Sequence, residues 1–225
     1  MNFRRLAIAT AAARLDAQER FYGDRLGLPV HRDPNRVGVT CGPARIEFVA
    51  AEGAPFTHFA LLAPGNRFTE ALAWFGDRVK LLPDPDTGQT VFDFDFWNAQ
   101  ACYFEDPAGN VVELIAHRGI EDSDRPGFDT GDLHGLSEVG LVTADKPAAV
   151  AALRAELGVE VWDGSADGPG LAFAGERGRT LILAPPGRRW LPTEWAAVAC
   201  PSEVELELER TGSLELESGQ ITIRS

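Results

Sequence analysis

"FYGDRLGL", residues Phe21 to Leu28, reappears as "WFGDRVKL", residues Trp74 to Leu81, which lies 53 positions further along the chain. The same offset places "FRRLAIAT" (Phe3–Thr10) over "FTHFALLA" (Phe56–Ala63). In each copy, an apolar stretch typical of a strand precedes a polar turn and then the repeated helix. An offset shared by a strand and a helix indicates repeated supersecondary units rather than a chance match.

Each unit is predicted to contain a strand, a helix and then further strands. The first unit comprises a strand at Phe3–Thr10, a helix at Leu15–Leu26, a strand at Pro29–Thr40 interrupted near "DPNR", and a strand at Ala44–Ala50. The second unit comprises a strand at Phe56–Ala63, a helix at Arg67–Val79, and strands near Thr90–Trp97, Gln100–Glu105 and Val111–Ala116.

A third unit follows the first two. "LSEVGLVT" (Leu136–Thr143) resembles the earlier first strands, and Pro147–Gly158 predicts a helix that starts with proline and ends with glycine. Further strands are expected near Glu160–Trp162, Leu171–Ala174 and Thr180–Ala184. The remainder, including "TEWAAVAC" and "VELELERTGSLELESGQITIRS", is strand-like and has no helical pattern. A fourth unit is therefore predicted to be incomplete.

The stretch "HRGIEDSDRPGFDTGD", His117 to Asp132, breaks all periodicity with charges, glycine and proline. The sequence as a whole predicts an α+β fold, in which repeated βαβββ units form curved mixed sheets in two lobes. We expect residues 1–118 to hold the first two units paired with each other and residues 119–132 to be a linker. Residues 133–225 are expected to hold the third unit and the strands without a helix.

Charge and cysteine usage limit the partners. The net charge of −13 argues against nucleic acid or an anionic membrane surface, because both repel an acidic protein. The three cysteines are widely spaced and form no Cys-x-x-Cys pair, which favours a reducing, cytoplasmic setting over a disulfide framework or a zinc knuckle. The start "MNFRRLAIATAAARLDA" has features of a secretory signal, but its internal counterpart in the second unit argues against one.

A helix ending in Phe-Tyr-x-x-x-Leu-Gly-Leu, the βαβββ order and "YFEDPAGNVVEL" (Tyr103–Leu114) together resemble the vicinal oxygen chelate superfamily. That superfamily includes glyoxalase I, the fosfomycin and bleomycin resistance proteins and extradiol dioxygenases. The resemblance covers Phe3–His117 best and Leu136–Ala184 more loosely. Asp106 to Asn110 is predicted to be a structural hairpin, because Asp-Pro-x-Gly-Asn suits a tight turn that sets the register of the next strand.

The resemblance implies a metal site. In the superfamily, two units form a curved, open barrel whose inward side chains on the first and last strands bind a divalent ion. The corresponding positions here are Arg5 and His58 on first strands, and Glu47 and Glu113 on last strands. We therefore expect one cleft in residues 1–118 with His58, Glu113 and Glu47 as ligands for Zn²⁺, Fe²⁺, Mn²⁺ or Ni²⁺. His58 and Glu113 are also the candidate acid/base pair.

Arg5 departs from the family pattern, because an arginine cannot ligate a metal. Arg5 could pair with Glu47 and replace the ion, or it could bind a substrate carboxylate or phosphate. Trp97 could line the cleft or belong to the core. Glu138 stands where Arg5 and His58 stand in the earlier units, but "RTLILAP" offers no matching carboxylate. The second half is for that reason predicted to be a scaffold, a lid or a partner-binding sheet.

Two classes of function fit these residues. The first is an enzyme that acts on a small oxygenated metabolite as a lyase, an isomerase or a dioxygenase. The second is a protein of the bleomycin-resistance kind that binds a small molecule without turnover. The fold alone does not choose between them, because one scaffold supports several chemistries. A homodimer is compatible with both classes.

Overall fold

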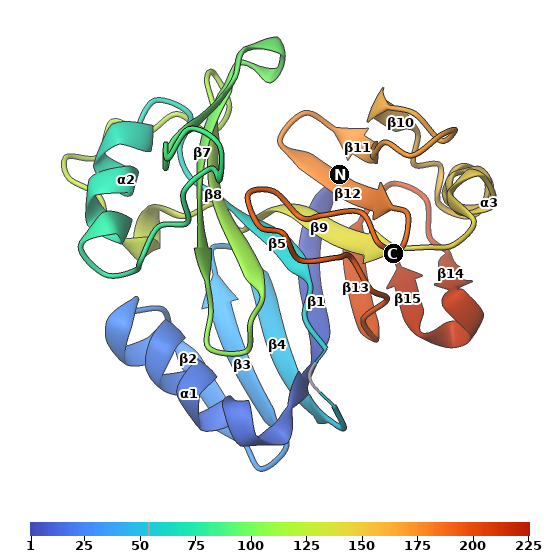
Figure 1. Cartoon of the computed structure of the whole chain (residues 1–225), viewed down its shortest axis with the longest axis horizontal. Coiled ribbons are helices and arrows are strands. Elements are labelled where there is room, and N and C mark those ends of the chain that lie inside the picture. The colour runs from blue at the N-terminus through green and yellow to red at the C-terminus, as the bar shows by residue number, and fades with distance from the viewer. Residues whose placement is uncertain (54) are drawn as a thin grey trace.

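The computed structural model describes residues 1–53 and 55–225, which form two curved mixed sheets (Figure 1). Sheet A has the strand order β14-β15-β13-β1-β4-β3-β2, and sheet B has the order β10-β11-β12-β9-β5-β8-β7-β6. The predicted α+β class, the repeated units and the two lobes are confirmed. The fourth unit has strands but no α-helix in the part of the chain that the structure describes, as expected.

The strands follow the repeated order within each unit. Those of sheet A are β1 (Asn2–Ala11), β2 (Val30–Asp33), β3 (Arg36–Cys41), β4 (Ala44–Ala51), β13 (Ser202–Glu207), β14 (Ser213–Leu216) and β15 (Ile221–Arg224). Those of sheet B are β5 (His58–Leu62), β6 (Phe92–Phe94), β7 (Ala99–Glu105), β8 (Val111–His117), β9 (Leu136–Val142), β10 (Val161–Gly164), β11 (Ala172–Glu176) and β12 (Arg179–Ala184).

Each complete unit contributes one helix after its first strand. These are α1 (Leu15–Glu19), α2 (Phe68–Gly76) and α3 (Lys146–Ala152). The first and third helices each continue into a π-helical turn, at Arg20–Arg25 and Leu153–Leu157 respectively. The wider turns lie within the helices predicted at Leu15–Leu26 and Pro147–Gly158. None of the helices in residues 1–53 and 55–225 is long and apolar enough to cross a membrane.

The pairing of the units differs from the expectation. The first two units do not share a sheet: β1 pairs antiparallel with β13, whereas β5 pairs antiparallel with β9. The incomplete fourth unit therefore completes the sheet of the first unit. Side chains across this pair are complementary, because Arg5 lies opposite Glu205 while Leu6 lies opposite Val204 on the buried face. Strand alternation predicted the faces correctly but could not identify this partner.

The segment 119–132 is not a joint between lobes, since it connects β8 to β9 within sheet B. It is held by many polar contacts. A capping box joins Asp129 and Asp132, and the Thr130 hydroxyl donates to the carbonyl of Leu26. The predicted strand "TEWAAVAC" is also absent, because residues 185–200 instead form an irregular strap that follows β12. We call these residues the 185–200 strap.

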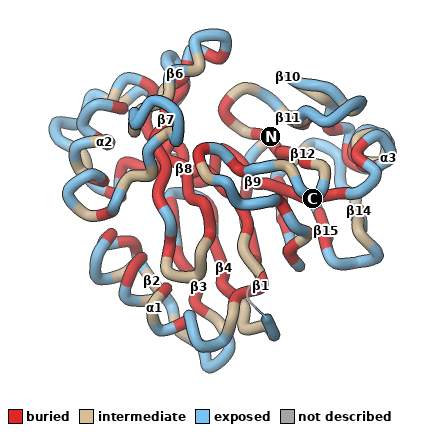
Figure 2. Tube along the Cα trace, in the orientation of Figure 1, coloured by how far each residue is buried: buried red, intermediate tan, exposed pale blue. Residues whose placement is uncertain are grey.

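The two sheets share one apolar core, which appears as the buried strands at the centre of the molecule in Figure 2. Leu6 and Phe48 of sheet A belong to the same cluster as Phe59 and Leu114 of sheet B. A second cluster lies on the other face of sheet B and includes Trp190 of the 185–200 strap. Sheet B is therefore covered on both faces, and this second face carries the candidate site.

The hairpin at Asp106–Asn110 has the predicted structural role. One carboxylate oxygen of Asp106 accepts hydrogen bonds from the amides of Ala108 and Asn110, at 2.9 and 3.0 Å. The other accepts from Gln18 at 2.7 Å and from the Tyr22 hydroxyl at 3.0 Å. Because Gln18 and Tyr22 belong to the first unit, this buried carboxylate also connects the units of the two sheets.

Candidate functional site

Three polar side chains converge on the strap-covered face of sheet B. They are His58 at the start of β5, Glu113 on β8 and Glu138 on β9, and all three are buried. The Nε2 atom of His58 lies 3.5 Å from Glu113 Oε2 and 3.9 Å from Glu138 Oε2. One potential ligand atom from each residue lies within 4.8 Å of the others. Such a group can bind one metal ion.

The register of the three strands explains this convergence. Ala60 lies between the two carboxylates, because it pairs with Glu113 on β8 and with Glu138 on β9. His58 precedes Ala60 by two residues and therefore points to the same face of the strand. The hairpin fixes this register further, since the side-chain oxygen of Asn110 accepts a hydrogen bond from the amide of Thr57 at 2.9 Å.

The imidazole of His58 is oriented for metal binding. Its Nδ1 atom lies 3.0 Å from the carbonyl oxygen of Val111. A carbonyl can only accept, so Nδ1 carries the proton, and in the neutral ring Nε2 then offers its lone pair toward the carboxylates. Metal-binding histidines are commonly held in this way by a hydrogen bond at the opposite ring nitrogen.

No permanently charged cation lies beside the two carboxylates in the described chain. Burial raises the pKa of Glu113, and the nearby carboxylate of Glu138 raises it further, while the hydroxyl of Tyr103 opposes the rise. Within the described chain, neither glutamate lies within 4.0 Å of a lysine or arginine nitrogen. Two buried like charges require a proton or a cation between them. The donor set therefore fits a divalent ion, held by one imidazole and two carboxylates.

The residue of the third unit that corresponds to Glu113 of the second unit is apolar. In the second unit, Glu113 on the last strand lies opposite Ala60, which follows His58 by two residues. In the third unit the matching residue is Ile182, which lies opposite Gly140, two residues after Glu138. An ion at this site would have three protein ligands, and its remaining positions would be open to ligand oxygens. Open positions of this kind are typical of catalytic rather than structural metal sites.

A cavity of about 500 Å³ opens beside these three residues. Its walls are mainly aromatic and aliphatic: Phe94, Phe96, Trp97, Tyr103, Leu171, Phe173, Ile182, Trp190 and Leu191. The volume is in the range of small-molecule sites. Trp190 of the 185–200 strap lies over His58, with ring centroids 5.1 Å apart. Gly140 permits this approach, because a Cβ atom there would lie 2.8 Å from the Trp190 ring.

Trp97, predicted to contact substrate, forms part of this cavity wall. It lies in a short 3₁₀ turn after β6, and its indole nitrogen donates to Asp163 at 2.7 Å. Trp97 is also buried and packs edge-on against Phe173, with ring centroids 4.5 Å apart. The wall and core descriptions of Trp97 therefore both apply.

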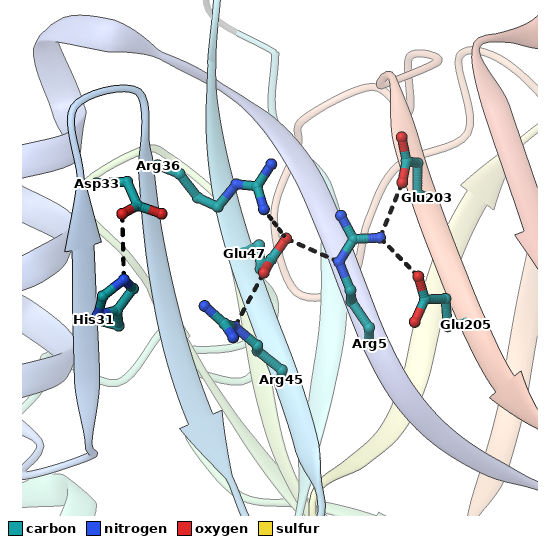
Figure 3. Close-up of polar contacts among 8 residues, drawn as sticks. All are labelled: Arg5, His31, Asp33, Arg36, Arg45, Glu47, Glu203 and Glu205. Atoms are coloured by element: carbon teal, nitrogen blue, oxygen red, sulfur yellow. Dashed lines mark hydrogen bonds and ion pairs between the residues drawn. The ribbon is translucent and has the colours of Figure 1, made fainter.

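Arg5 and Glu47 do not join this cavity, so the prediction of one cleft holding all four residues is wrong. Both belong to sheet A, where Glu47 is surrounded by three guanidinium groups (Figure 3). Arg5 Nε donates to Glu47 at 2.8 Å, while Arg36 and Arg45 lie 3.1 and 3.0 Å from the same carboxylate. Glu47 is thus committed to ion pairs and is not free to ligate a metal.

Of the two roles considered for Arg5, the geometry matches internal pairing. Its Nη1 also donates to Glu203 at 2.9 Å and to Glu205 at 3.1 Å (Figure 3). Burial lowers the pKa of Arg5, but the hydrogen bonds to Glu203 and Glu47 outweigh burial and raise it. Arg5 therefore carries a permanent positive charge among three carboxylates.

Glu138 is the site residue that the sequence-based ligand set lacked. A signal was present, because the alignment of first strands already placed Glu138 with Arg5 and His58. The last strand of the third unit has no carboxylate, so the sequence pattern within that unit does not complete a ligand group around Glu138. The structure shows that a glutamate from the second unit, Glu113, completes the group, since β5 and β9 are neighbours.

Comparisons with known proteins agree with this fold. Neither models of protein families nor curated proteins show a match to the sequence. Among solved structures, a variant of glyoxalase I from Zea mays is 14% identical to this chain, with a TM-score of 0.58. The match covers 100% of this chain and 92% of that one. Glyoxalase I itself from Zea mays gives 0.56 at 14% identity, covering 91% and 74%.

A candidate dioxygenase from Bacillus subtilis subsp. subtilis str. 168 has a TM-score of 0.54 at 14% identity, and the match covers 100% of this chain and 84% of that one. At such identities the likeness establishes the fold. The fold that the resemblance to the vicinal oxygen chelate superfamily implies is thereby confirmed.

Proposed function

We propose that this chain is a divalent-metal-dependent lyase or isomerase that binds a small oxygenated molecule in the cavity of sheet B. One observation carries the proposal: His58, Glu113 and Glu138 bring an imidazole nitrogen and two buried carboxylates within 4.8 Å of one another. No arginine or lysine neutralises these carboxylates among the described residues. When bound, a divalent ion would polarise an oxygen of the ligand and stabilise the charge that develops on it.

The residues of the chain supply the remaining functions. In the absence of an ion Glu113 holds a proton, because burial and the carboxylate of Glu138 raise its pKa, and it would release that proton on becoming a ligand. Tyr103 lies directly opposite Glu113 in the pairing of β7 with β8 and lines the same cavity. Trp190 covers His58 and shields the site from water, which strengthens every charge interaction within it.

A dioxygenase remains the second enzymatic candidate, since the same three-ligand arrangement would leave room for two further ligand atoms. Binding without turnover is the non-enzymatic alternative. The apolar walls of the cavity favour it in one respect, because they would bind an organic ligand even without an ion.

Metal content is the first test. The full chain, purified without chelator, should contain about one divalent ion per chain by elemental analysis, and His58→Ala should lose it. His31→Ala is the matched control, because His31 is an exposed histidine beside Asp33 on sheet A. Absence of metal from the wild type, or its retention in His58→Ala, would refute the proposed site.

Two probes separate the reaction classes once metal is bound. 2-Hydroxyacetophenone has adjacent oxygens and an aromatic body, so a lyase or isomerase should accelerate exchange of its C2 hydrogens in D₂O, measured by NMR. Catechol tests for oxygen consumption, as expected of a dioxygenase. A metal-loaded protein that binds both probes and changes neither would support binding without turnover.

A further inference from the structure

The cavity contains a cation with no acidic partner. Arg188, on the 185–200 strap, lines the cavity and is half-buried. Its Nη1 donates to the carbonyl oxygen of Arg189 at 2.8 Å, and within the described chain no carboxylate oxygen lies within 4.0 Å of its guanidinium. Burial lowers the pKa of Arg188. A half-buried guanidinium without a carboxylate partner is available to bind an anionic group that enters the cavity.

A second cation lies close behind the cavity wall. Lys146, at the start of α3, is only 3% exposed. Its ammonium group donates to the carbonyl oxygens of Ser165 at 2.8 Å and Gly170 at 2.6 Å, and both of these residues line the cavity. Burial lowers the pKa of Lys146, Asp167 opposes this, and the nearby positive charge of Arg188 lowers it further.

The cavity thus carries charges of both signs. Glu113, Glu138 and Arg188 all line it, and Lys146 lies behind the loop that contains Ser165 and Gly170. The third carboxylate that lines the cavity, Asp163, already accepts a hydrogen bond from Trp97. An anionic group entering this cavity is repelled by the two glutamates and attracted to Arg188, while the aromatic walls accept an apolar body.

We propose that Arg188 binds an anionic group of the ligand, so that the preferred ligand of this cavity is an aromatic or similarly apolar organic anion. Lys146 is a positioning residue, because it secures the Ser165–Gly170 loop and adds positive potential without lining the cavity. This inference rests on the proposed function, in that it assigns the ligand class of the same cavity. A guanidinium fork suits a carboxylate or sulfonate geometrically.

Two dyes of the same aromatic body test the charge requirement. 8-Anilinonaphthalene-1-sulfonate carries a sulfonate, and N-phenyl-1-naphthylamine lacks it. Fluorescence titration of the full chain should show that Arg188→Gln weakens binding of the sulfonate by about tenfold or more, the loss expected for a hydrogen bond to a charged group. Binding of the neutral dye should change less than about twofold. Arg188→Lys should restore part of the sulfonate affinity.

Arg189→Gln is the matched control, because the neighbouring Arg189 is exposed, pairs with Glu194 and does not line the cavity. It should leave the affinity for both dyes unchanged. Equal loss of both dyes in Arg188→Gln would show a merely structural role and overturn the inference. Unchanged sulfonate binding in Arg188→Gln, or no binding of either dye to the wild type, would overturn it as well.

The same variant separates this inference from the proposed metal site. Arg188→Gln should bind one equivalent of Mn²⁺ or Zn²⁺ as the wild type does, since Arg188 is not among the ligands. Loss of the sulfonate preference with intact metal binding supports the inference. A wild type that binds no metal but keeps the Arg188-dependent preference would refute the metal-dependent function and leave the anion subsite standing.

Discussion

Sheets A and B place corresponding side chains around corresponding alanines. In sheet B, Ala60 pairs with Glu113 on one side and with Glu138 on the other. In sheet A, Ala7 pairs in the same way with Glu47 and Glu203. The residue two positions before the alanine is His58 in sheet B and Arg5 in sheet A. The two sheets therefore differ chiefly in the side chain that faces the two carboxylates.

That difference decides what neutralises the carboxylates. Arg5 donates to Glu47 at 2.8 Å and to Glu203 at 2.9 Å, so its guanidinium supplies a permanent cation between them. His58 supplies an imidazole without a permanent charge, so the charge of Glu113 and Glu138 remains to be balanced by a proton or an exchangeable ion. One substitution at an inward position thus distinguishes a self-neutralised sheet from one that is suited to bind metal.

The largest expected effect is loss of metal on removing one carboxylate of sheet B. Glu138→Gln should weaken Mn²⁺ or Zn²⁺ binding by about 100-fold or more, because a charged ligand is removed from a three-ligand site. Glu203→Gln, at the corresponding position of sheet A, should change the affinity less than about twofold. Calorimetric titration measures both. Similar losses in the two variants would contradict the assignment of the site to sheet B.

Converting sheet A should have the next largest effect. Arg5→His alone leaves Glu47 paired with Arg36 and Arg45, so we expect no second metal equivalent. The triple variant Arg5→His, Arg36→Gln, Arg45→Gln should bind a second equivalent, about tenfold or more weaker than the first, through the new histidine, Glu47 and Glu203. Metal titration gives the stoichiometry. A single equivalent in the triple variant would show that sheet A lacks the required geometry, not merely a ligand.

Two glycines test how closely neighbouring side chains pack against the two sheets. A Cβ atom at Gly140 would lie 2.8 Å from the buried Trp190 ring and 3.0 Å from the His58 carbonyl oxygen. A Cβ atom at Gly38 in sheet A would lie 2.8 Å from the guanidinium end of the long Arg45 side chain. We expect Gly140→Ala to lower the free energy of unfolding by about 1–3 kcal/mol and Gly38→Ala by less than about 0.5 kcal/mol. Urea denaturation compares them, and equal costs would contradict this account.

The smallest predicted effect concerns pH. Because burial and Glu138 raise the pKa of Glu113, the folded state holds this proton more tightly than the unfolded state. Stability of the metal-free protein should then fall as pH rises above the ordinary glutamate pKa, until the raised folded-state pKa is passed. Glu113→Gln removes this loss, so in chelator its free energy of unfolding should exceed that of the wild type at pH 8 and should approach the wild-type value at pH 5.

Glu47→Gln provides the comparison for this pH series. Glu47 is paired with three arginines, so its loss should not stabilise the protein at any pH between 5 and 8. Urea unfolding with chelator at each pH measures both variants. A gain in Glu47→Gln matching that of Glu113→Gln would mean that the carboxylates of the two sheets are not distinguished by their partners.

The sequence predicted much of the fold and part of the site. Alternation along each strand placed His58 and Glu113 on one face, and the 53-residue offset revealed the units. Alternation fixes a face but not a partner strand, since consecutive elements are neighbours often but not always. The pairing of β5 with β9, and hence the role of Glu138, depends on contacts that no local pattern encodes.

The two sheets also differ in when they can be completed during synthesis. Sheet B is one continuous stretch, from β5 to β12, so all of its strands are available once Ala184 has left the ribosome. Sheet A must wait for β13, because Leu6 near the start of the chain pairs with Val204 near its end. Until then one edge of β1 has no strand to pair with, and such an edge favours aggregation. The nascent chain thus completes the sheet that carries the candidate site first, and its N-terminal sheet last.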